Sequence, residues 1–142
     1  MTVSRILKKK GNFALSMKAS ESVQRAVDLL SSHDMGAVVV VDNQEHVIGI
    51  VSERDIVRAF KAHGSKALAL TAEDLMTRSP FTCKADDRVD HVLASMDKRN
   101  FRHAPVIAEG KLAGMISIKD IVKLKLEEVQ SEADEIRKYI AA

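Results

Sequence analysis

Cysteine, tryptophan, net charge and long apolar runs are all scarce in this sequence of 142 residues. With one cysteine no intramolecular disulfide can form, so a reducing compartment such as the cytoplasm is expected. Because only 4% of residues are aromatic, the core must consist of aliphatic side chains and methionine. The net charge of +2 makes a nucleic-acid partner unlikely, and no apolar run reaches the roughly 20 residues of a membrane-spanning helix.

The residue patterns of catalytic and metal sites are also missing. The five histidines show no metal-ligand spacing such as H-x-x-x-H, and neither G-x-x-x-x-G-K-[ST] nor G-x-G-x-x-G occurs. Cys83 has no histidine near it in the sequence and is expected to be a packed thiol. We therefore expect no enzymatic activity, no catalytic residue and no bound metal.

What the sequence does contain is an internal repeat. Gly49-Ile-Val-Ser-Glu-Arg-Asp-Ile-Val57 and Gly114-Met-Ile-Ser-Ile-Lys-Asp-Ile-Val122 share five of nine residues at an offset of 65. Upstream, apolar residues spaced i, i+3, i+4, i+7 recur at an offset of 66. They are Val23, Ala26, Val27 and Leu30 in the first copy, and Val89, Val92, Leu93 and Met96 in the second. A repeat of this length indicates a duplicated supersecondary unit.

Each copy predicts the order β-α-β-β-α. A short extended piece, at 14–17 and 81–84, precedes an amphipathic helix that carries the apolar stripe, and we expect Ser20 and Asp86 to cap these helices. Two strands and a second helix follow, the strands at 38–41 and 47–51, then at 104–107 and 112–116. The predicted fold class is α/β (α+β), with both repeats packed as one pseudo-twofold module.

The repeats also set the expected domain limits, at residues 3–63, 71–129 and 130–142, the last being a helical extension. Its stripe has a heptad-like spacing of 4, 3, 4, 3, 4, formed by Val122, Leu126, Val129, Ala133, Ile136 and Ile140. We expect a homodimer that this stripe strengthens. The alternative is that the stripe packs on its own module, and we expect the first half of the C-terminal helix to do so.

The repeated motif resembles the CBS domain. The pattern is Gly, two apolar residues and Ser-x-x-Asp-Ile after a Val-rich strand, and it occurs twice in register within residues 3–129. The resemblance implies a stand-alone pair that binds an adenosine ligand in two clefts between the repeats. AMP is expected first, with ADP, ATP, NAD(H) and S-adenosylmethionine as further candidates. It also implies flat twofold dimers and a regulated partner protein that the sequence does not identify.

The two Ser-x-x-Asp motifs are the candidate ligand sites. By spacing alone they fit a helix capping box as well as a binding site. The resemblance implies that each Asp accepts hydrogen bonds from a ribose diol. It assigns one cleft to Asp120, Ser117, Met115, Lys119, Lys10 and Leu15. It assigns the other to Asp55, Ser52, Ile50, Arg54, Thr77 and Phe81.

A basic pair, Arg102-His103, precedes the strand at 104–107. Exposure to solvent is the usual fate of such charges, but the resemblance implies that the pair faces the ligand phosphate, with His103 able to carry a positive charge. The first repeat has Gly36 and Ala37 at these positions. We therefore expect unequal clefts, with the Asp120 cleft binding a phosphorylated ligand more tightly.

Two other functions stay open. An enzyme acting on a nucleotide would have to work without a recognisable nucleophile, metal set or phosphate loop. A dimerisation adaptor with empty clefts would carry the same repeats, and a ligand screen separates it from a sensor.

Overall fold

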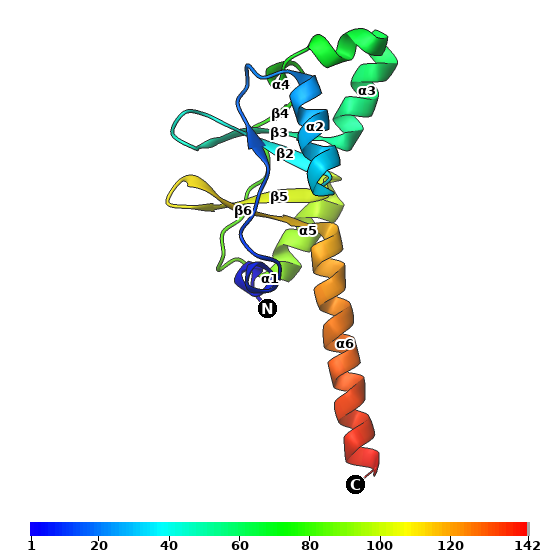
Figure 1. Cartoon of the computed structure of the whole chain (residues 1–142). Helices are drawn as coiled ribbons and strands as arrows, with labels where there is room; N and C mark the ends of the chain where they lie inside the picture. Colours follow the sequence, from blue (N-terminus) through cyan, green and yellow to red (C-terminus); the bar gives the residue numbers. More distant parts are fainter. Residues whose placement is uncertain (142) are drawn as a thin grey trace.

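The computed structural model describes residues 1–141 as two α+β units and a long C-terminal helix that extends away from them (Figure 1). The elements of the first unit and its connection are α1 (Val3–Lys10), β1 (Ser16–Met17), α2 (Val23–His33), β2 (Ala37–Val41), β3 (Val47–Ser52), α3 (Glu53–His63) and a 3-10 helix (Gly64–Ala69). They are followed by α4 (Ala72–Leu75), β4 (Thr77–Arg78), α5 (Val89–Arg99), β5 (His103–Ala108), β6 (Lys111–Ser117) and α6 (Ile118–Ala141). Within residues 1–141, no helix is both long and apolar enough to cross a membrane.

The β-α-β-β-α order is confirmed in the first unit, and the second unit follows it except that a single bridge residue stands in place of the first strand. In the first, β1 runs parallel to β2, and β2 pairs antiparallel with β3. In the second, β5 and β6 form an antiparallel hairpin, and Cys83 makes a parallel bridge to Val106 where the first unit has β1. The mixed α+β fold class that the repeat predicts is therefore confirmed.

The predicted helix caps are wrong by two residues. Ser22, not Ser20, precedes α2, and its side chain accepts a hydrogen bond from a backbone N–H of the first turn. Arg88, not Asp86, precedes α5 and provides no side-chain cap.

A turn stabilised by a carboxylate precedes both α2 and α5, so each helix begins later in the sequence than predicted. Glu21 accepts a hydrogen bond from the backbone N–H of Lys18 at 2.8 Å, and Asp87 accepts one from the backbone N–H of Lys84 at 2.9 Å. Because these residues belong to the turn, the helical backbone begins only after it. Both copies of the repeat share this arrangement, so it belongs to the duplicated unit.

The segments that lead into the two units cross over. Val3, Ile6 and Leu7 of α1 are buried in the core of the second unit. In return, Ala72 of α4 lies in the core of the first unit, and β4 extends the first sheet by pairing with β3. The crossing brings Lys10 beside the second unit and Thr77 beside the first.

The two units bury an apolar layer between them. Ala37, Val39 and Val41 of β2 form one buried cluster with Met115 of β6. A hydrogen bond from the backbone N–H of Leu112 to the carbonyl of Glu45 also joins the hairpins. As predicted, duplication supplies each small sheet with a partner for its apolar face.

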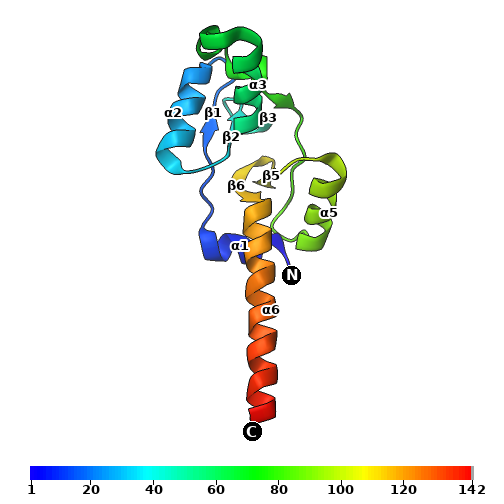
Figure 2. The same ribbon diagram turned by 90° about the vertical axis from the view of Figure 1, so that its right-hand side faces the viewer.

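Helix α6 packs on the module through a face that the heptad stripe does not include. Ile121 and Leu124 are buried, whereas Val122, Leu126 and Val129 are exposed. The expectation that the first half of this helix packs on its own module is therefore confirmed, although Ile121 and Leu124 make the contact and the stripe residues do not. Figure 2 shows that the second half of α6 projects well beyond the rest of the fold.

Candidate functional site

A cavity of about 470 Å³ lies between the two units, where β3 ends and α3 begins. We call it the Asp55 cavity. It lies within the 300–1,000 Å³ range of small-molecule pockets. Its walls are formed by Gly36, Ile50, Ser52, Glu53, Arg54, Asp55, Arg58, Thr77, Pro80, Phe81, Arg99, Asn100, Phe101, Arg102 and His103.

The capping box at the start of α3 positions Asp55. Its Oδ2 accepts hydrogen bonds from the backbone N–H of Ser52 at 2.8 Å and from the Ser52 hydroxyl at 2.9 Å. The backbone N–H of Asp55 donates in turn to Ser52 Oγ at 3.3 Å. No side chain or backbone group of residues 1–141 donates to Oδ1, so this oxygen can accept a further hydrogen bond. The capping interaction and a ligand-binding role are therefore compatible in one carboxylate.

Basic side chains dominate the walls of the cavity. The guanidinium groups come from Arg54, Arg58, Arg99 and Arg102, against the carboxylates of Glu53 and Asp55. Arginine offers a planar fork of donors that matches phosphate geometry. The cavity therefore favours an anionic ligand, although the whole chain is nearly neutral.

One wall of the cavity is aromatic. The rings of Phe81 and Phe101 lie with their centroids 5.0 Å apart, and the Arg99 guanidinium lies 5.9 Å from the centroid of Phe81. Ile50 lines the same space from β3. This wall offers a flat apolar surface to a planar base, at a short distance from the arginines.

The structure corrects the cleft to which Arg102 and His103 belong. Both residues line the Asp55 cavity, not a cavity beside Asp120, because the inter-unit layer brings the start of β5 to the end of β3. A Cβ atom on Gly36 would lie 2.8 Å from Nε2 of His103, so a larger residue there would require the imidazole to shift. The basic pair therefore lies with Asp55, and not with Asp120 as the resemblance had implied.

His103 is neutral at pH 7 in this setting. Burial lowers the pKa of its imidazole below the ordinary value, the Asp120 carboxylate raises it in part, and the charges of Lys10 and Arg102 lower it further. The positive charge expected at His103 from the sequence is therefore absent near neutral pH without a ligand. The imidazole can still act as a hydrogen-bonding group.

The Asp120 side is closed by a lysine. Lys10 Nζ donates to Asp120 Oδ2 at 2.8 Å and to the carbonyl of Met115 at 3.0 Å. The backbone N–H of Ser117 also donates to Oδ2, at 2.8 Å. Burial alone would raise the pKa of Asp120, but the hydrogen bonds from Lys10 and Ser117 and the lysine charge outweigh it and lower the pKa overall. Asp120 is therefore ionised and already paired.

Four of the predicted residues lie outside both sites. Leu15 is buried in the core of the first unit, and Met115 and Ala37 are buried in the layer between the units. Lys119 is exposed and lines none of the cavities described. The small cavity beside Asp120, about 110 Å³, lies between α1 and α6 and has Lys9, Lys10 and Lys123 among its walls.

Sequence reasoning missed several residues of the Asp55 cavity. Arg58 lies one turn after Arg54 on α3, so helical periodicity could have found it. Arg99, Asn100 and Phe101 directly precede the basic pair and could have been included with it. Glu53 and Pro80 carried no signal of their own.

No metal or nucleophile site accompanies the cavity in residues 1–141. No group of three or more His, Cys, Asp or Glu side chains is placed to hold a metal ion in this part of the chain. Cys83 is buried, and its thiol donates to the carbonyl of Pro105 at 3.7 Å. Burial raises the pKa of this thiol to about 12, and Asp87 adds to the effect, so Cys83 is the packed thiol that the sequence predicted.

Known proteins share this fold. The family model described as the CBS domain matches residues 14–62 and 72–127. A CBS-domain-containing protein of Agrobacterium tumefaciens superposes with a TM-score of 0.83 at 35% identity, covering 87% of this chain and 92% of that one. The CBS domain pair of protein MJ0100, in complex with 5′-methylthioadenosine and S-adenosyl-L-methionine, gives 0.81 at 26% identity, covering 90% and 98%. A Pyrobaculum aerophilum CBS domain protein complexed with AMP gives 0.75 at 28% identity, covering 84% and 89%.

The match extends over both repeats. The chain spans about two thirds of the length of the curated relatives that it matches first. Two matched segments cover most of the chain, and the solved structures reproduce both units together. The chain therefore belongs to the CBS-domain family, as a tandem pair of CBS domains.

Proposed function

We propose that this CBS pair is a regulatory module that binds an adenosine ligand, AMP first among the candidates, in the Asp55 cavity. One observation carries the proposal: a single cavity combines a carboxylate with a free acceptor oxygen, four arginines and an aromatic wall. The similar CBS proteins solved with AMP, and with 5′-methylthioadenosine and S-adenosyl-L-methionine, support an adenosine ligand.

Each part of AMP has a matching group in the cavity. Oδ1 of Asp55 accepts from the ribose diol while Oδ2 keeps the capping box. The base lies against Phe81 and Ile50, and the phosphate reaches the arginines. Four guanidinium groups favour a phosphate over the cationic sulfonium of S-adenosylmethionine. ADP and ATP carry the same adenosine and more negative charge, and NAD(H) carries the same adenosine on a diphosphate.

We propose further that each native chain binds a single ligand molecule, in the Asp55 cavity. Lys10 and Ser117 both donate to Oδ2 of Asp120, so a ribose diol would have to compete with the lysine ammonium that lies against this carboxylate. The cavity beside Asp120 is about 110 Å³, well below the size of a nucleotide pocket. In this proposal the pair regulates a partner protein through a homodimer and has no catalytic activity of its own.

Calorimetry of the purified full chain with AMP tests the proposal. Asp55→Asn should weaken AMP binding by roughly tenfold or more, because a charge-assisted hydrogen bond contributes about 1.5–3 kcal/mol. Asp74→Asn is a matched control, since Asp74 forms the same kind of capping box with Thr71 but does not line the Asp55 cavity.

ATP, NAD and S-adenosylmethionine are titrated in parallel. If none of the four ligands binds at millimolar concentration, the adaptor function takes the place of the sensor. Conversion of any of them to product would establish an enzyme instead.

A further inference from the structure

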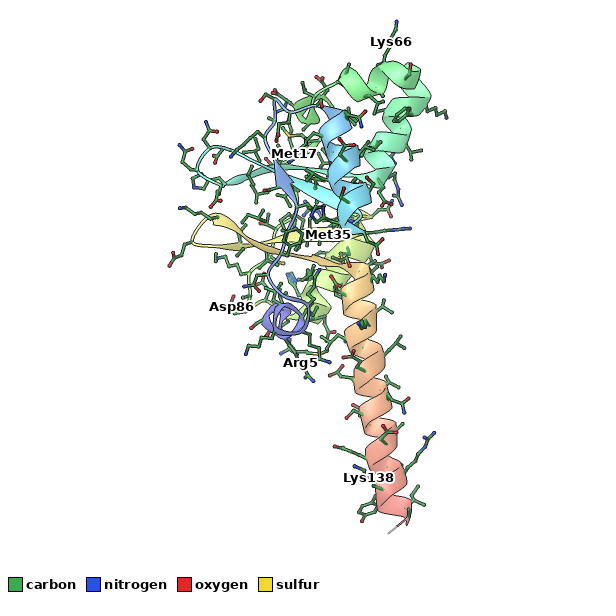
Figure 3. All side chains as sticks on the ribbon, viewed as in Figure 1. Arg5, Met17, Met35, Lys66, Asp86 and Lys138 are labelled. Atoms are coloured by element: carbon green, nitrogen blue, oxygen red, sulfur yellow. The ribbon has the colours of Figure 1, made fainter. Side chains whose placement is uncertain are left out.

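The second half of α6 presents an apolar face that the fold leaves uncovered. Leu126, Val129, Ile136 and Ile140 are 65%, 63%, 59% and 78% exposed. In Figure 3 the side chains around Lys138 project from this part of the helix with no other element beside them. Four large aliphatic residues on one face of a solvent-surrounded helix indicate a partner.

The module itself cannot cover this face. Successive residues of an α-helix turn by about 100°, which places Val122, Leu126 and Val129 within one narrow strip. Ile121 and Leu124, which hold α6 against the module, lie about 80° or more away from each of these three residues. Ion pairs of Lys9 with Glu127 and of Lys125 with Asp90 fix the same orientation. The strip therefore faces outward while the helix stays docked.

The spacing of the strip is that of a coiled coil. Taking the 4, 3 alternation as a heptad, Val122, Val129 and Ile136 occupy d positions, and Leu126, Ala133 and Ile140 occupy a positions. The strip is continuous from the edge of the module to residue 140. A repeat of 3.5 residues keeps the same face turned toward a second helix over this length.

Charges beside the strip select its partner and its orientation. Glu132 occupies a g position and Arg137 the following e position. In a parallel pair of identical helices, g of one faces the following e of the other, so Glu132 meets Arg137 twice. In an antiparallel pair over the same residues, Glu132 would meet Glu132, and Lys123 would meet Arg137. Only the parallel pair is attractive.

From this charge pattern we infer that residues 122–140 of α6 form a parallel, in-register coiled coil with α6 of a second copy of this chain. The inference deepens the homodimer of the proposed function, and it does not depend on which ligand is bound. It places both CBS modules at the same end of a common rod. The branched residues at d fit a two-stranded coil less well than leucine, so the mass of the complex is measured along with its orientation.

Disulfide trapping reads the orientation directly. A parallel pair brings the two copies of residue 136 face to face, within the 4.4–6.8 Å between Cα atoms that a disulfide allows. Ile136→Cys should therefore form a covalent dimer under mild oxidation, and the buried Cys83 does not compete. Ser131→Cys, at an outward f position, is the matched control and should remain uncrosslinked.

Charge reversal provides an independent reading. Arg137→Glu faces Glu132 in a parallel pair but Lys123 in an antiparallel one. We expect the dimer dissociation constant, measured by sedimentation, to rise roughly tenfold in Arg137→Glu, because two exposed ion pairs become repulsions. The double change E132R/R137E should restore association.

The outcomes separate the orientation from the dimer and from ligand binding. A monomeric full chain overturns both the coiled coil and the homodimer, while AMP binding is judged by calorimetry alone. A dimer that gives no disulfide at position 136, or that tightens in Arg137→Glu, overturns only the parallel orientation. A trimer or tetramer overturns the two-stranded pair.

Discussion

Lys10 keeps the Asp120 side of the module closed, and replacing it should open a second ligand site. The change Lys10→Met keeps most of the aliphatic stem and removes the ammonium that donates to Asp120 and to the carbonyl of Met115. Asp120 then keeps the bond from the Ser117 N–H to Oδ2 and loses the ammonium that lies against its carboxylate. This is the arrangement that Asp55 already has.

The cost in stability follows from the burial of the pair. A charge-assisted hydrogen bond contributes about 1.5–3 kcal/mol, and the Lys10 and Asp120 side chains are 26% and 22% exposed, so solvent screens part of it. We expect a loss of about 1–2 kcal/mol and a melting temperature lower by about 3–10 °C. AMP at a hundredfold excess returns about 2.7 kcal/mol for each site that it fills. The variant should therefore gain more from AMP than the native chain does.

The number of AMP molecules bound per chain, measured by calorimetry, tests whether Lys10 closes the Asp120 side. The native chain should bind one AMP, Lys10→Met two, and the double variant K10M/D55N one. Asp120→Asn, which removes the same ion pair from the other side, should stay at one and controls for the loss of stability. Two ligands on the native chain, or one on Lys10→Met, would refute the reasoning that Lys10 closes the site.

Three further predictions concern single side chains. Arg58→Gln should weaken AMP binding by roughly tenfold in calorimetry while leaving adenosine binding unchanged, because the arginine contacts only the phosphate in the proposed arrangement. Since burial lowers the pKa of His103, the unfolded chain binds more protons below pH 6.5, so stability should fall as the pH drops from 6.5 through the lowered pKa. The free energy of unfolding of His103→Asn, measured by denaturant titration at several pH values, should lack this part of the pH dependence. An unchanged pH dependence would contradict the assignment. Cys83, with a pKa of about 12, should resist thiol reagents at pH 8 in the native chain and react after unfolding; rapid labelling of folded protein would show that the thiol is accessible.

The local sequence patterns predicted the helices and strands correctly, because each pattern lies within a single helix or strand. The stripe from Val23 to Leu30 and the valine run of β2 report a helix and a buried strand in any tertiary setting. The caps failed because Glu21 and Asp87 extend the preceding turn, and a serine two residues early looks equally suitable in the sequence. Here an alternative local hydrogen bond decided the boundary.

The prediction of the site residues was wrong where it depended on how the two units pack against each other. The Ser-x-x-Asp spacing identified both capping aspartates, and one of them, Asp55, lines the large cavity. The basic pair was attached to the wrong aspartate, because adjacency in the sequence joins Arg102 to the second unit, whereas the apolar layer carries it to the first unit's cavity. Leu15 and Met115 were placed in clefts although their apolar side chains are needed in the cores. An alignment of the two repeats does not predict which side chains become buried in the interface between the two units.

The two aspartates are also connected through His103. This imidazole lines the Asp55 cavity, yet its pKa also responds to Asp120, in the first turn of α6, and to Lys10, at the end of α1. Under the proposed function, a ligand phosphate beside His103 would favour the imidazolium form. That charge would compete with Lys10 for Asp120, at the root of the helix through which two chains are inferred to pair. Any such effect of AMP on dimerisation must be matched by an equal effect of dimerisation on AMP affinity, since coupling free energies are reciprocal. Under the proposed function, the duplicated unit therefore supplies two versions of one site: an open version that takes the ligand, and a version at the first turn of α6 that Lys10 closes.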